Sequence, residues 1–507
     1  MNRKTIAGLI AFLTLAGCAF TSCGDAAGAA EQTDAGETGA GTEAVTETAE
    51  PDPFADFDYA GEQVRIWTST NDPGGVGNSN YLIEGPEEET GDVVADSAFI
   101  RNRSVEELLN VDLVFTQLDN TYETCGSTIS KVIMAGDDAY EFIINDLFPM
   151  ATLSVQGNFM NVADAPYIDR TQSYWYEGYM DELSLDGGGH MFLMAGDFFI
   201  DVLRSAHALY FNKNLLAELY DDGELLYREV LEGTWTYDKM LSYISDCYQD
   251  LNGDGAKDEG DRYGLVVNQV WGPSIPFIIS ADLEYVTLQN DGSMTLAMNN
   301  ERSVKLLETL NEIFHGDATA RTDLIGTGDM GNQDAIKLFK AGRSLLLGYN
   351  RLGSFDDLRD MEAEVGILPY PKLDDTQESY LTSSHDTTEI GVIPVTNSKF
   401  DMTCAVLEVL NRETQKYVLP AYYETGLKVK YSRDDMSSQM IDIIHDTIGG
   451  SFALAFSSAC SDIFMKASFY EPLMSKTTDF VSNYTKREKG AQKKLDGIID
   501  SFREIDS

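Results

Sequence analysis

Hydrophobic and polar residues alternate with a period of two over 63–67, two further apolar-rich segments of the first third of the chain are typical of strands, and helical patterns fill the intervals. Strands are expected at 63–67, 111–115 and 140–144, and helices at 97–109 and 128–134. Because helices regularly separate the strands, this region predicts βαβ units and a largely parallel sheet. Asn145 and Asp146 follow directly after the third strand.

The alternation of strands and helices continues to the end of the chain. Segment 206–216 predicts a strand followed by a helix, and Thr236 is a good N-cap for a helix over 237–248. Further helices are expected at 300–314, 334–340, 402–410 and 488–502, and further strands at 264–268, 344–347, 365–368 and 390–395. The chain contains no internal repeat, so one α/β architecture is expected throughout.

The N-terminus is typical of an export signal. Arg3 and Lys4 precede an apolar segment, 6–15, that is too short for an ordinary transmembrane helix. The sequence LAGC that follows ends at Cys18 and resembles the lipobox of bacterial lipoproteins, in which the cysteine becomes the lipidated N-terminus. Cys23 is the alternative. We expect a signal peptide at 1–17 and a mature protein held outside the cytoplasm by lipid alone.

Residues 18–58 are rich in Ala, Gly, Thr and Glu and almost lack large apolar side chains. Such a segment buries too little surface to offset the entropy of ordering, so it predicts a flexible tether.

The charge balance excludes some classes of partner. The 507 residues carry a formal net charge of −48, with 43% hydrophobic residues. Such a field repels phosphate backbones, so nucleic-acid binding is not expected, and an anionic ligand would need a locally basic site. The length fits about three domains of roughly 150 residues or a large two-lobed fold.

Four cysteines lie beyond the leader, far apart and without a CxxC pair, which argues against a zinc site. They are Cys125, Cys247, Cys404 and Cys460. Pairing as disulfides in an exported protein and burial as free thiols both remain open.

One acidic stretch has a spacing that dictates a particular chemistry. Segment 250–261 places oxygen side chains at loop positions 1, 3, 5, 9 and 12 and a glycine at position 6, which is the ligand order of an EF-hand loop. A calcium ion there would take side-chain oxygens and one backbone carbonyl from Asp250, Asn252, Asp254, Ala256, Asp258 and Asp261. The flanking patterns are a helix and a strand, so we expect a structural calcium clasp rather than a helix–loop–helix sensor.

The sequence lacks the usual signatures of an enzyme. It has five histidines without metal-ligand spacing, and no G-x-S-x-G, P-loop or dinucleotide fingerprint after a strand. We therefore expect no catalytic activity. Carboxylate pairs for glycoside hydrolysis stay open, because their separation cannot be derived from sequence.

Four stretches in order carry a resemblance to a known family. They are the lipobox leader with its tether, the segment YFNKNLL at 210–216, the segment TWTY at 234–237 with the acidic loop and Tyr263-Gly264, and GILPYPKLD at 366–374. Together they resemble the family 1 extracellular solute-binding proteins, the lipoprotein receptors of bacterial ABC importers.

The resemblance implies a two-lobed periplasmic-binding-protein-like α/β fold, with solute bound in a cleft that closes by hinge bending. It places the N-terminal lobe at 59–202 and 391–437 and the C-terminal lobe at 203–390 and 438–507. It also implies a monomer that hands its solute, a carbohydrate and most simply an oligosaccharide, to membrane permeases. A surface glycan hydrolase and a ligand-sensing module without transport are the alternatives.

In open α/β sheets, ligands bind beyond the carboxyl ends of the strands, and sugars need aromatic planes beside polar groups. Polar and aromatic residues at such positions and at the expected lobe crossings are the candidate binding residues: Trp67, Thr68, Ser69, Asn145, Asp146, Asp201, Arg204, Trp271, Tyr349, Asn350, Arg351, His385, Asp386 and Glu389.

Overall fold

The computed structural model describes residues 52–72, 76–119, 121–185, 187–325, 333–358, 360–423 and 435–505. Every element below belongs to the unit Pro53–Ser507. The predicted signal peptide, Cys18 and Cys23 lie outside the described residues, as does nearly all of the predicted tether.

The folded unit begins at Pro53, inside the segment expected to be tether. Phe54 is only 5% exposed, and its ring lies 5.1 Å from that of Phe57 and 6.3 Å from that of Tyr167. Two aromatic residues near the end of a polar segment are therefore enough to attach it to the core.

The first sheet has the order β11-β3-β1-β2. Strands β1 (Glu62–Ser69), β2 (Val111–Leu118) and β3 (Phe142–Asp146) are parallel, and β11 (Glu389–Val392) runs antiparallel to β3. Helices α2 (Val93–Leu109) and α3 (Tyr122–Met134) form the crossovers, which confirms the predicted βαβ units. Helix α2 ends at Asn110, whose left-handed φ of 49° is typical of a helix C-terminus.

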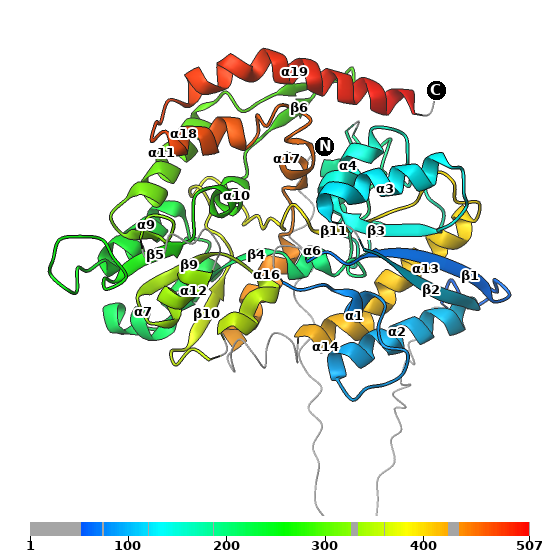
Figure 1. The fold of residues 1–507 in the computed structure, drawn as a ribbon, viewed down its shortest axis with the longest axis horizontal. Coiled ribbons are helices and arrows are strands. Elements are labelled where there is room, and N and C mark those ends of the chain that lie inside the picture. Colours follow the sequence, from blue (N-terminus) through cyan, green and yellow to red (C-terminus); the bar gives the residue numbers. More distant parts are fainter. Residues whose placement is uncertain are drawn as a thin grey trace, which may run out of the picture. The chain divides into compact units, whose positions relative to one another are not determined.

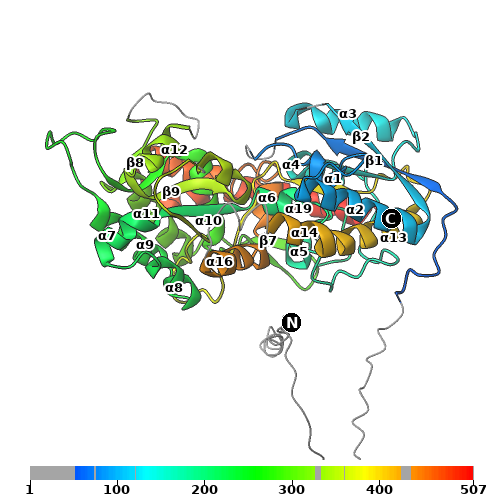
Figure 2. The same ribbon diagram turned by 90° about the horizontal axis from the view of Figure 1, so that it is seen from below.

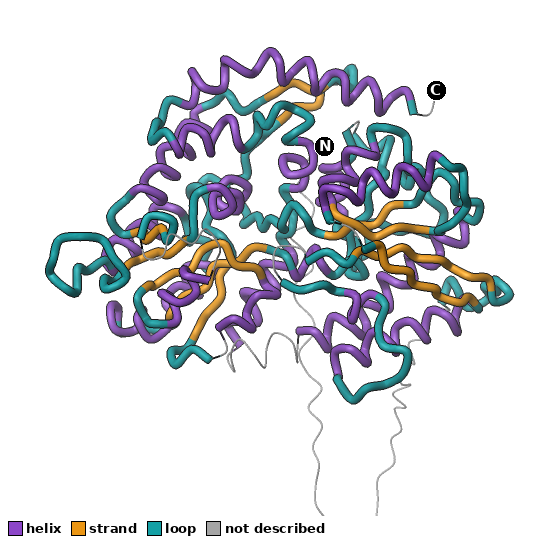
Figure 3. The backbone as a smooth tube through the Cα atoms, viewed as in Figure 1, coloured by secondary structure: helices purple, strands orange, loops and turns teal. Residues whose placement is uncertain are grey.

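The second sheet has the order β10-β4-β9-β5-β8. Its strands are β4 (His207–Asn212), β5 (Tyr263–Val267), β8 (Thr319–Arg321), β9 (Ser344–Arg351) and β10 (Val365–Leu368). Strand β5 is parallel to β8 and β9, whereas β4 is antiparallel to β9 and β10, so this sheet is mixed. Figure 3 shows the two sheets as separate groups of orange strands.

The helices predicted after residue 230 form where expected. Helix α9 (Tyr237–Cys247) is capped by Thr236, whose side chain accepts from the Lys239 N–H, and α11 (Glu301–His315) is capped by Asn300. Helices α12 (Gln333–Lys340), α13 (Phe400–Glu413) and α19 (Phe480–Glu504) also match their predictions.

Several elements were not predicted. Helix α10 (Trp271–Ser280) contains Pro273 and Pro276, and every residue after Trp271 is buried, so it has no polar face to give a helical period. The hairpin of β6 (Val286–Leu288) and β7 (Met294–Leu296) contacts α19 (Figure 1). Helix α7 (Lys213–Tyr220) follows β4, as the pattern over 206–216 predicts. The other helices without a prediction are α1 (Asn80–Ile83), α4 (Leu147–Ser154), α5 (Glu177–Leu183), α6 (Asp201–Arg204), α8 (Leu225–Leu231), η2 (Leu352–Leu358), η3 (Thr414–Val418), α14 (Leu419–Ala421), α16 (Asp435–Asp446), α17 (Ser451–Phe456), η5 (Lys466–Tyr470) and α18 (Glu471–Met474).

The chain crosses between the two sheets more than once. Strand β11 joins the first sheet although β10, the strand before it, belongs to the second. Helix α17 packs on α4 and α5, and α16 packs on β10 and α8 (Figures 1 and 2). The residue boundaries of the two lobes stay a prediction.

Cys125, Cys247, Cys404 and Cys460 are all free and buried, which settles the open question in favour of thiols. Among the described residues, no helix combines the length and the apolar composition that crossing a membrane would need.

Candidate functional site

A cavity of about 460 Å³ lies where elements of both sheets meet the C-terminal part of the chain, which is a size typical of small-molecule sites. Phe148 comes from α4, directly after a strand of the first sheet, and Tyr349 comes from β9 of the second. The complete lining is Phe148, Trp271, Ile275, Tyr349, His385, Asp386, Thr387, Leu454, Ser457, Ser458, Asp462, Met465 and Lys466.

Two aromatic residues dominate one side of the cavity. Trp271 opens α10, is partly exposed, and meets Tyr470 edge-on with ring centroids 5.0 Å apart. The Tyr349 ring lies so close to Gly272 that a Cβ there would stand 2.4 Å from Cζ of the tyrosine. Glycine is therefore required at 272 for the tyrosine to reach this position.

Polar groups surround the Tyr349 ring. Its hydroxyl lies 3.3 Å from His385 Nε2, and His385 Nδ1 lies 2.9 Å from Thr387 Oγ1 and 3.0 Å from Asp386 Oδ1. The Arg351 guanidinium lies 4.2 Å from the ring centroid of Tyr349. The cavity thus offers hydrogen-bond donors and acceptors beside an aromatic plane, and Trp271, Tyr349, His385 and Asp386 are the predicted binding residues that line it.

Three further buried residues lie next to Tyr349. Arg351 is buried, and the buried His207 ring stacks on that of Tyr349 with centroids 5.6 Å apart. Burial, together with the nearby charges of Arg351 and His385, holds the pKa of His207 well below its usual range, so this imidazole is neutral. Asn350 is buried between Tyr349 and Arg351 on β9 and is not part of the lining.

A second group of predicted residues forms a buried polar cluster at the carboxyl ends of β1 and β3. Strand β11 begins with Glu389 directly opposite Asp146 of β3. The Ser79 hydroxyl lies 2.7 Å from Asp201 Oδ2 and 3.5 Å from Glu389 Oε2. We call the following residues the carboxylate cluster, all of them less than 9% exposed: Ser69, Asn145, Asp146, Asp201, Arg204 and Glu389.

The carboxylate cluster holds three acids and one base. Arg204 donates to Asp201 Oδ1 at 2.8 Å, and Asn71 donates to Asp146 Oδ2 at 2.9 Å. One oxygen of Asp146 and one of Glu389 have no hydrogen-bond partner among the described residues. Burial, opposed by the Asn71 hydrogen bond and aided by the charge of Asp201, raises the pKa of Asp146 to about 7. Burial and the charges of Asp201 and Asp146 likewise raise the pKa of Glu389.

The carboxylate cluster adjoins the cavity but does not line it. The Leu147 N–H, one residue after Asp146, donates to the Thr388 carbonyl at 2.8 Å, and both chain neighbours, Phe148 and Thr387, reach the cavity. Thr68 lies at the edge of the cluster and donates to Glu84 at 2.6 Å.

Trp67 stands apart from the other predicted residues. It is 6% exposed and stacks on Tyr140 with centroids 4.6 Å apart. Strand β1 continues to Ser69, two residues beyond the predicted end, so Trp67 lies within the strand, opposite Ile143, rather than at its end.

The sequence patterns did not indicate the remaining residues that line the cavity. Phe148 and Thr387 are each within two residues of predicted ones, so a wider window at the strand ends would have included them. No comparable signal exists for residues 454–466, because they follow no strand of either sheet and match no motif.

The acidic loop has the flanks that the sequence predicted, α9 before it and β5 after it, and an antiparallel bridge between Gln249 and Arg262 closes it. Asp250 accepts the N–H groups of Gly253 and Gly255 at 2.6 and 2.9 Å, and both glycines have φ near 75°. The described residues contain no group of three His, Cys, Asp or Glu side chains placed to hold a metal. In this arrangement the Asp250 carboxylate accepts hydrogen bonds from backbone N–H groups of the loop, so the calcium site stays a prediction.

Comparisons with known proteins were made for the whole chain. No protein-family model matches it, and no curated protein matches it. Solved structures do match. A cyclo/maltodextrin-binding protein complexed with maltotetraose has a TM-score of 0.51 and 12% identity over 90% of this chain and 99% of that chain.

Two more solved structures are similar to this chain. An ABC-transporter solute-binding protein from Thermotoga lettingae, bound with α-D-tagatose, has a TM-score of 0.51 and 11% identity over 86% of this chain and all of that chain, 100%. A cyclic α-maltosyl-1,6-maltose binding protein from Arthrobacter globiformis has a TM-score of 0.54 and 13% identity over 86% of this chain and 100% of that chain. At such identities the likeness shows the fold alone, and this chain has the two-lobed α/β fold of the periplasmic solute-binding proteins.

Proposed function

We propose that the protein captures a carbohydrate, most simply an oligosaccharide, in the cavity between Trp271 and the C-terminal part of the chain. The observation that carries this proposal is the composition of the cavity wall. Trp271 and Tyr349 provide aromatic surface, and Asp386, His385 and Thr387 provide hydrogen-bonding groups. A sugar ring presents apolar C–H faces and polar edges, so it matches this combination.

In this proposal the protein delivers its solute to the permeases of an ABC importer and releases it unchanged. The proteins of similar fold are named for binding maltodextrins, tagatose and a cyclic maltosyl-maltose, which supports a carbohydrate as solute. The two-lobed fold supports capture by hinge closure.

A thermal-shift screen of purified protein against neutral oligosaccharides, monosaccharides, polyols and peptides tests the proposal. A solute present at 100 times its Kd raises the free energy of unfolding by about 2.7 kcal/mol, which shifts the melting temperature measurably. We expect carbohydrates to give the largest shifts, without release of new reducing ends. Shifts from peptides alone would overturn the carbohydrate assignment, and released reducing ends would favour a hydrolase.

We further propose that lipid attached to Cys18 holds the protein on the outer face of the cell membrane as a monomer. Replacing Cys18 by serine is expected to release the protein from the membrane fraction, because a thioether-linked acyl anchor needs the cysteine sulfur. The matched variant Cys23→Ser should stay membrane-bound. Fractionation followed by immunoblotting measures both, and the opposite pattern would assign the anchor to Cys23.

We also propose that calcium stabilises the acidic loop. Five acids stand within twelve residues there, with Lys257 as the loop's own cation, so a divalent ion would relieve their mutual repulsion. Calcium is expected to raise the melting temperature, and Asp250→Ala should abolish that rise while solute affinity is retained, because the loop does not line the cavity. A wild-type melting temperature that does not respond to calcium would contradict the proposal.

A further inference from the structure

Nearly half of the residues that line the cavity come from one short stretch near the C-terminus. We call residues 454–466 the C-terminal wall. This stretch belongs to neither sheet. Its lining residues are Leu454, Ser457, Ser458, Asp462, Met465 and Lys466.

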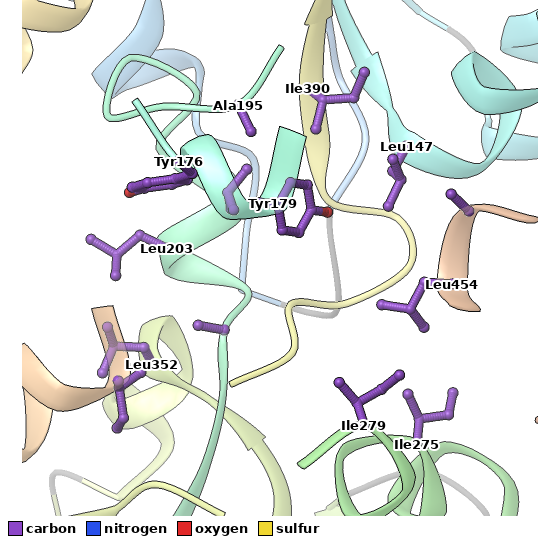
Figure 4. Close-up of a cluster of buried hydrophobic side chains, with 14 of the residues drawn as sticks. Leu147, Tyr176, Tyr179, Ala195, Leu203, Ile275, Ile279, Leu352, Ile390 and Leu454 are labelled. Carbon is purple, nitrogen blue, oxygen red and sulfur yellow. The ribbon is translucent and has the colours of Figure 1, made fainter. Parts of the chain in front are cut away.

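The C-terminal wall is fixed at its start by a half-buried acid of α5. The Glu182 carboxylate accepts the backbone N–H groups of Gly450 and Phe452 at 3.1 and 3.2 Å and the Ser451 hydroxyl at 3.2 Å. Leu454 lies in the same hydrophobic cluster as Leu147, Ile275 and Ile279 (Figure 4). The wall therefore starts from a defined position against the first sheet's helices.

The far end of the C-terminal wall is held by aromatic packing. The Phe464 ring lies 5.2 Å from that of Phe452 and 5.7 Å from that of Tyr285, and Cys460 and Ile463 are fully buried. Because these buried residues fix the backbone of the C-terminal wall, the polar side chains that it carries keep their positions. Fixed positions of polar groups are the condition for selective binding.

The backbone turns at the centre of the wall through an uncommon conformation. Ser461 and Asp462 have φ values of 62° and 55°, which residues other than glycine rarely adopt. The Asp462 N–H donates to the Ser457 carbonyl at 2.7 Å, and the Asp462 carbonyl accepts from Ala467 at 2.9 Å. Tyr349, across the cavity, has a φ of 61°. Such conformations persist where neighbours impose them, and they concentrate at functional sites.

This turn directs two opposite charges to the cavity without pairing them. Asp462 and Lys466 are four residues apart and both line the cavity. Neither side chain has an ion-pair or hydrogen-bond partner within the described part of the chain, although many lysines and arginines there contact a carboxylate. An unpaired carboxylate and an unpaired ammonium facing one cavity can accept and donate hydrogen bonds to a ligand.

We propose that Asp462 and Lys466 are specificity-determining residues, which hydrogen-bond hydroxyl groups of the solute from the C-terminal wall. The carboxylate of Asp462 accepts from one hydroxyl, and the ammonium of Lys466 donates to another. The inference rests on the proposed function, since it takes a polyhydroxylated solute as the ligand. A neutral sugar satisfies both charges at once, whereas a solute of either net charge is repelled by one of them.

The test compares isosteric variants in the full-length mature protein by isothermal titration calorimetry, with the carbohydrate that gives the largest thermal shift in the wild type. Asp462→Asn keeps the shape and suits the left-handed backbone, and Lys466→Met keeps the apolar stem. The controls Asp500→Asn and Lys489→Met remove the same charges from exposed positions of α19. Trp271→Ala serves as the positive control for loss of binding.

We expect each wall variant to bind at least about tenfold more weakly than the wild type, the loss typical of one hydrogen bond to a charged group, and to change the rank order of a sugar panel. The controls should keep both affinity and rank order. If Trp271→Ala loses affinity while both wall variants bind as tightly as the wild type, the proposal is overturned and the proposed function stands. If the wild type binds no carbohydrate, both fail. Melting curves without solute establish that each variant is folded.

Discussion

Replacing Trp271 by alanine is expected to weaken solute binding by roughly 30-fold, the effect of about 2 kcal/mol that a central aromatic contact contributes. Trp271 is the one tryptophan that lines the cavity, and it is partly exposed. The other three, Trp67, Trp175 and Trp235, are at most 6% exposed. A bound sugar ring can therefore reach the indole of Trp271 but not the others.

The same contact should be visible in fluorescence. Binding is expected to change the emission of the wild-type protein, and Trp271→Phe should remove most of that change while keeping part of the affinity. Trp67→Phe is the matched control, because its ring stacks on Tyr140 inside the first sheet. A Trp67→Phe variant that loses the signal, together with a Trp271→Phe variant that keeps it, would move the site to the first sheet.

Replacing Asp146 by asparagine is expected to stabilise the protein at pH 8 and to have little effect at pH 4. Burial raises the pKa of Asp146 from an ordinary 3.8 to about 7 in the folded state. Between these values the folded state binds a proton that the unfolded state has lost, so the free energy of unfolding falls as pH rises from about 4 to about 7. The difference corresponds to on the order of 4 kcal/mol, and asparagine removes it because it never ionises.

The measurement is the difference in melting temperature between Asp146→Asn and the wild type at each pH. Asparagine still accepts the hydrogen bond that Asn71 donates to Asp146, so the local geometry is retained. Asp500→Asn, at an exposed position of α19, should show no such pH-dependent gain. An Asp146→Asn variant that is less stable than the wild type at pH 8 would mean that the native state holds this carboxylate ionised. Glu389→Gln should behave like Asp146→Asn, because burial raises its pKa too.

Strands and helices were predictable where a few neighbouring residues determine them. Alternation over a few residues identified β1, and the predicted cap Thr236 sits at the start of its helix. A helix without such a local pattern was not predicted. Helix α10 is buried all round and contains two prolines, so neither its periodicity nor its composition indicates a helix.

The candidate site was predictable only in part, for a related reason. Trp271 and Tyr349 were found because the ligand site of an open sheet lies beyond its strand ends, and His385 and Asp386 because they precede an expected lobe crossing. The same rule selected Trp67, but β1 is two residues longer than its sequence pattern, so that residue is in the core. The rule also selected Asp146, and the expected lobe crossings selected Asp201 and Glu389. All three acids lie in a buried cluster beside the cavity.

By itself the sequence determined most strands of the two sheets, two residues that line the cavity, Tyr349 and Trp271, and an acidic composition that disfavours nucleic acid as a partner. The tertiary structure decided the pairing of β11 with β3, the burial of three acids at one place, and the contribution of the C-terminal wall to the cavity. These features depend on residues more than a hundred positions apart, such as Glu389 beside Asp146 and the joint lining of one cavity by Asp462 and Tyr349. Propensity and periodicity act within one element, so they carry no information about which distant elements meet.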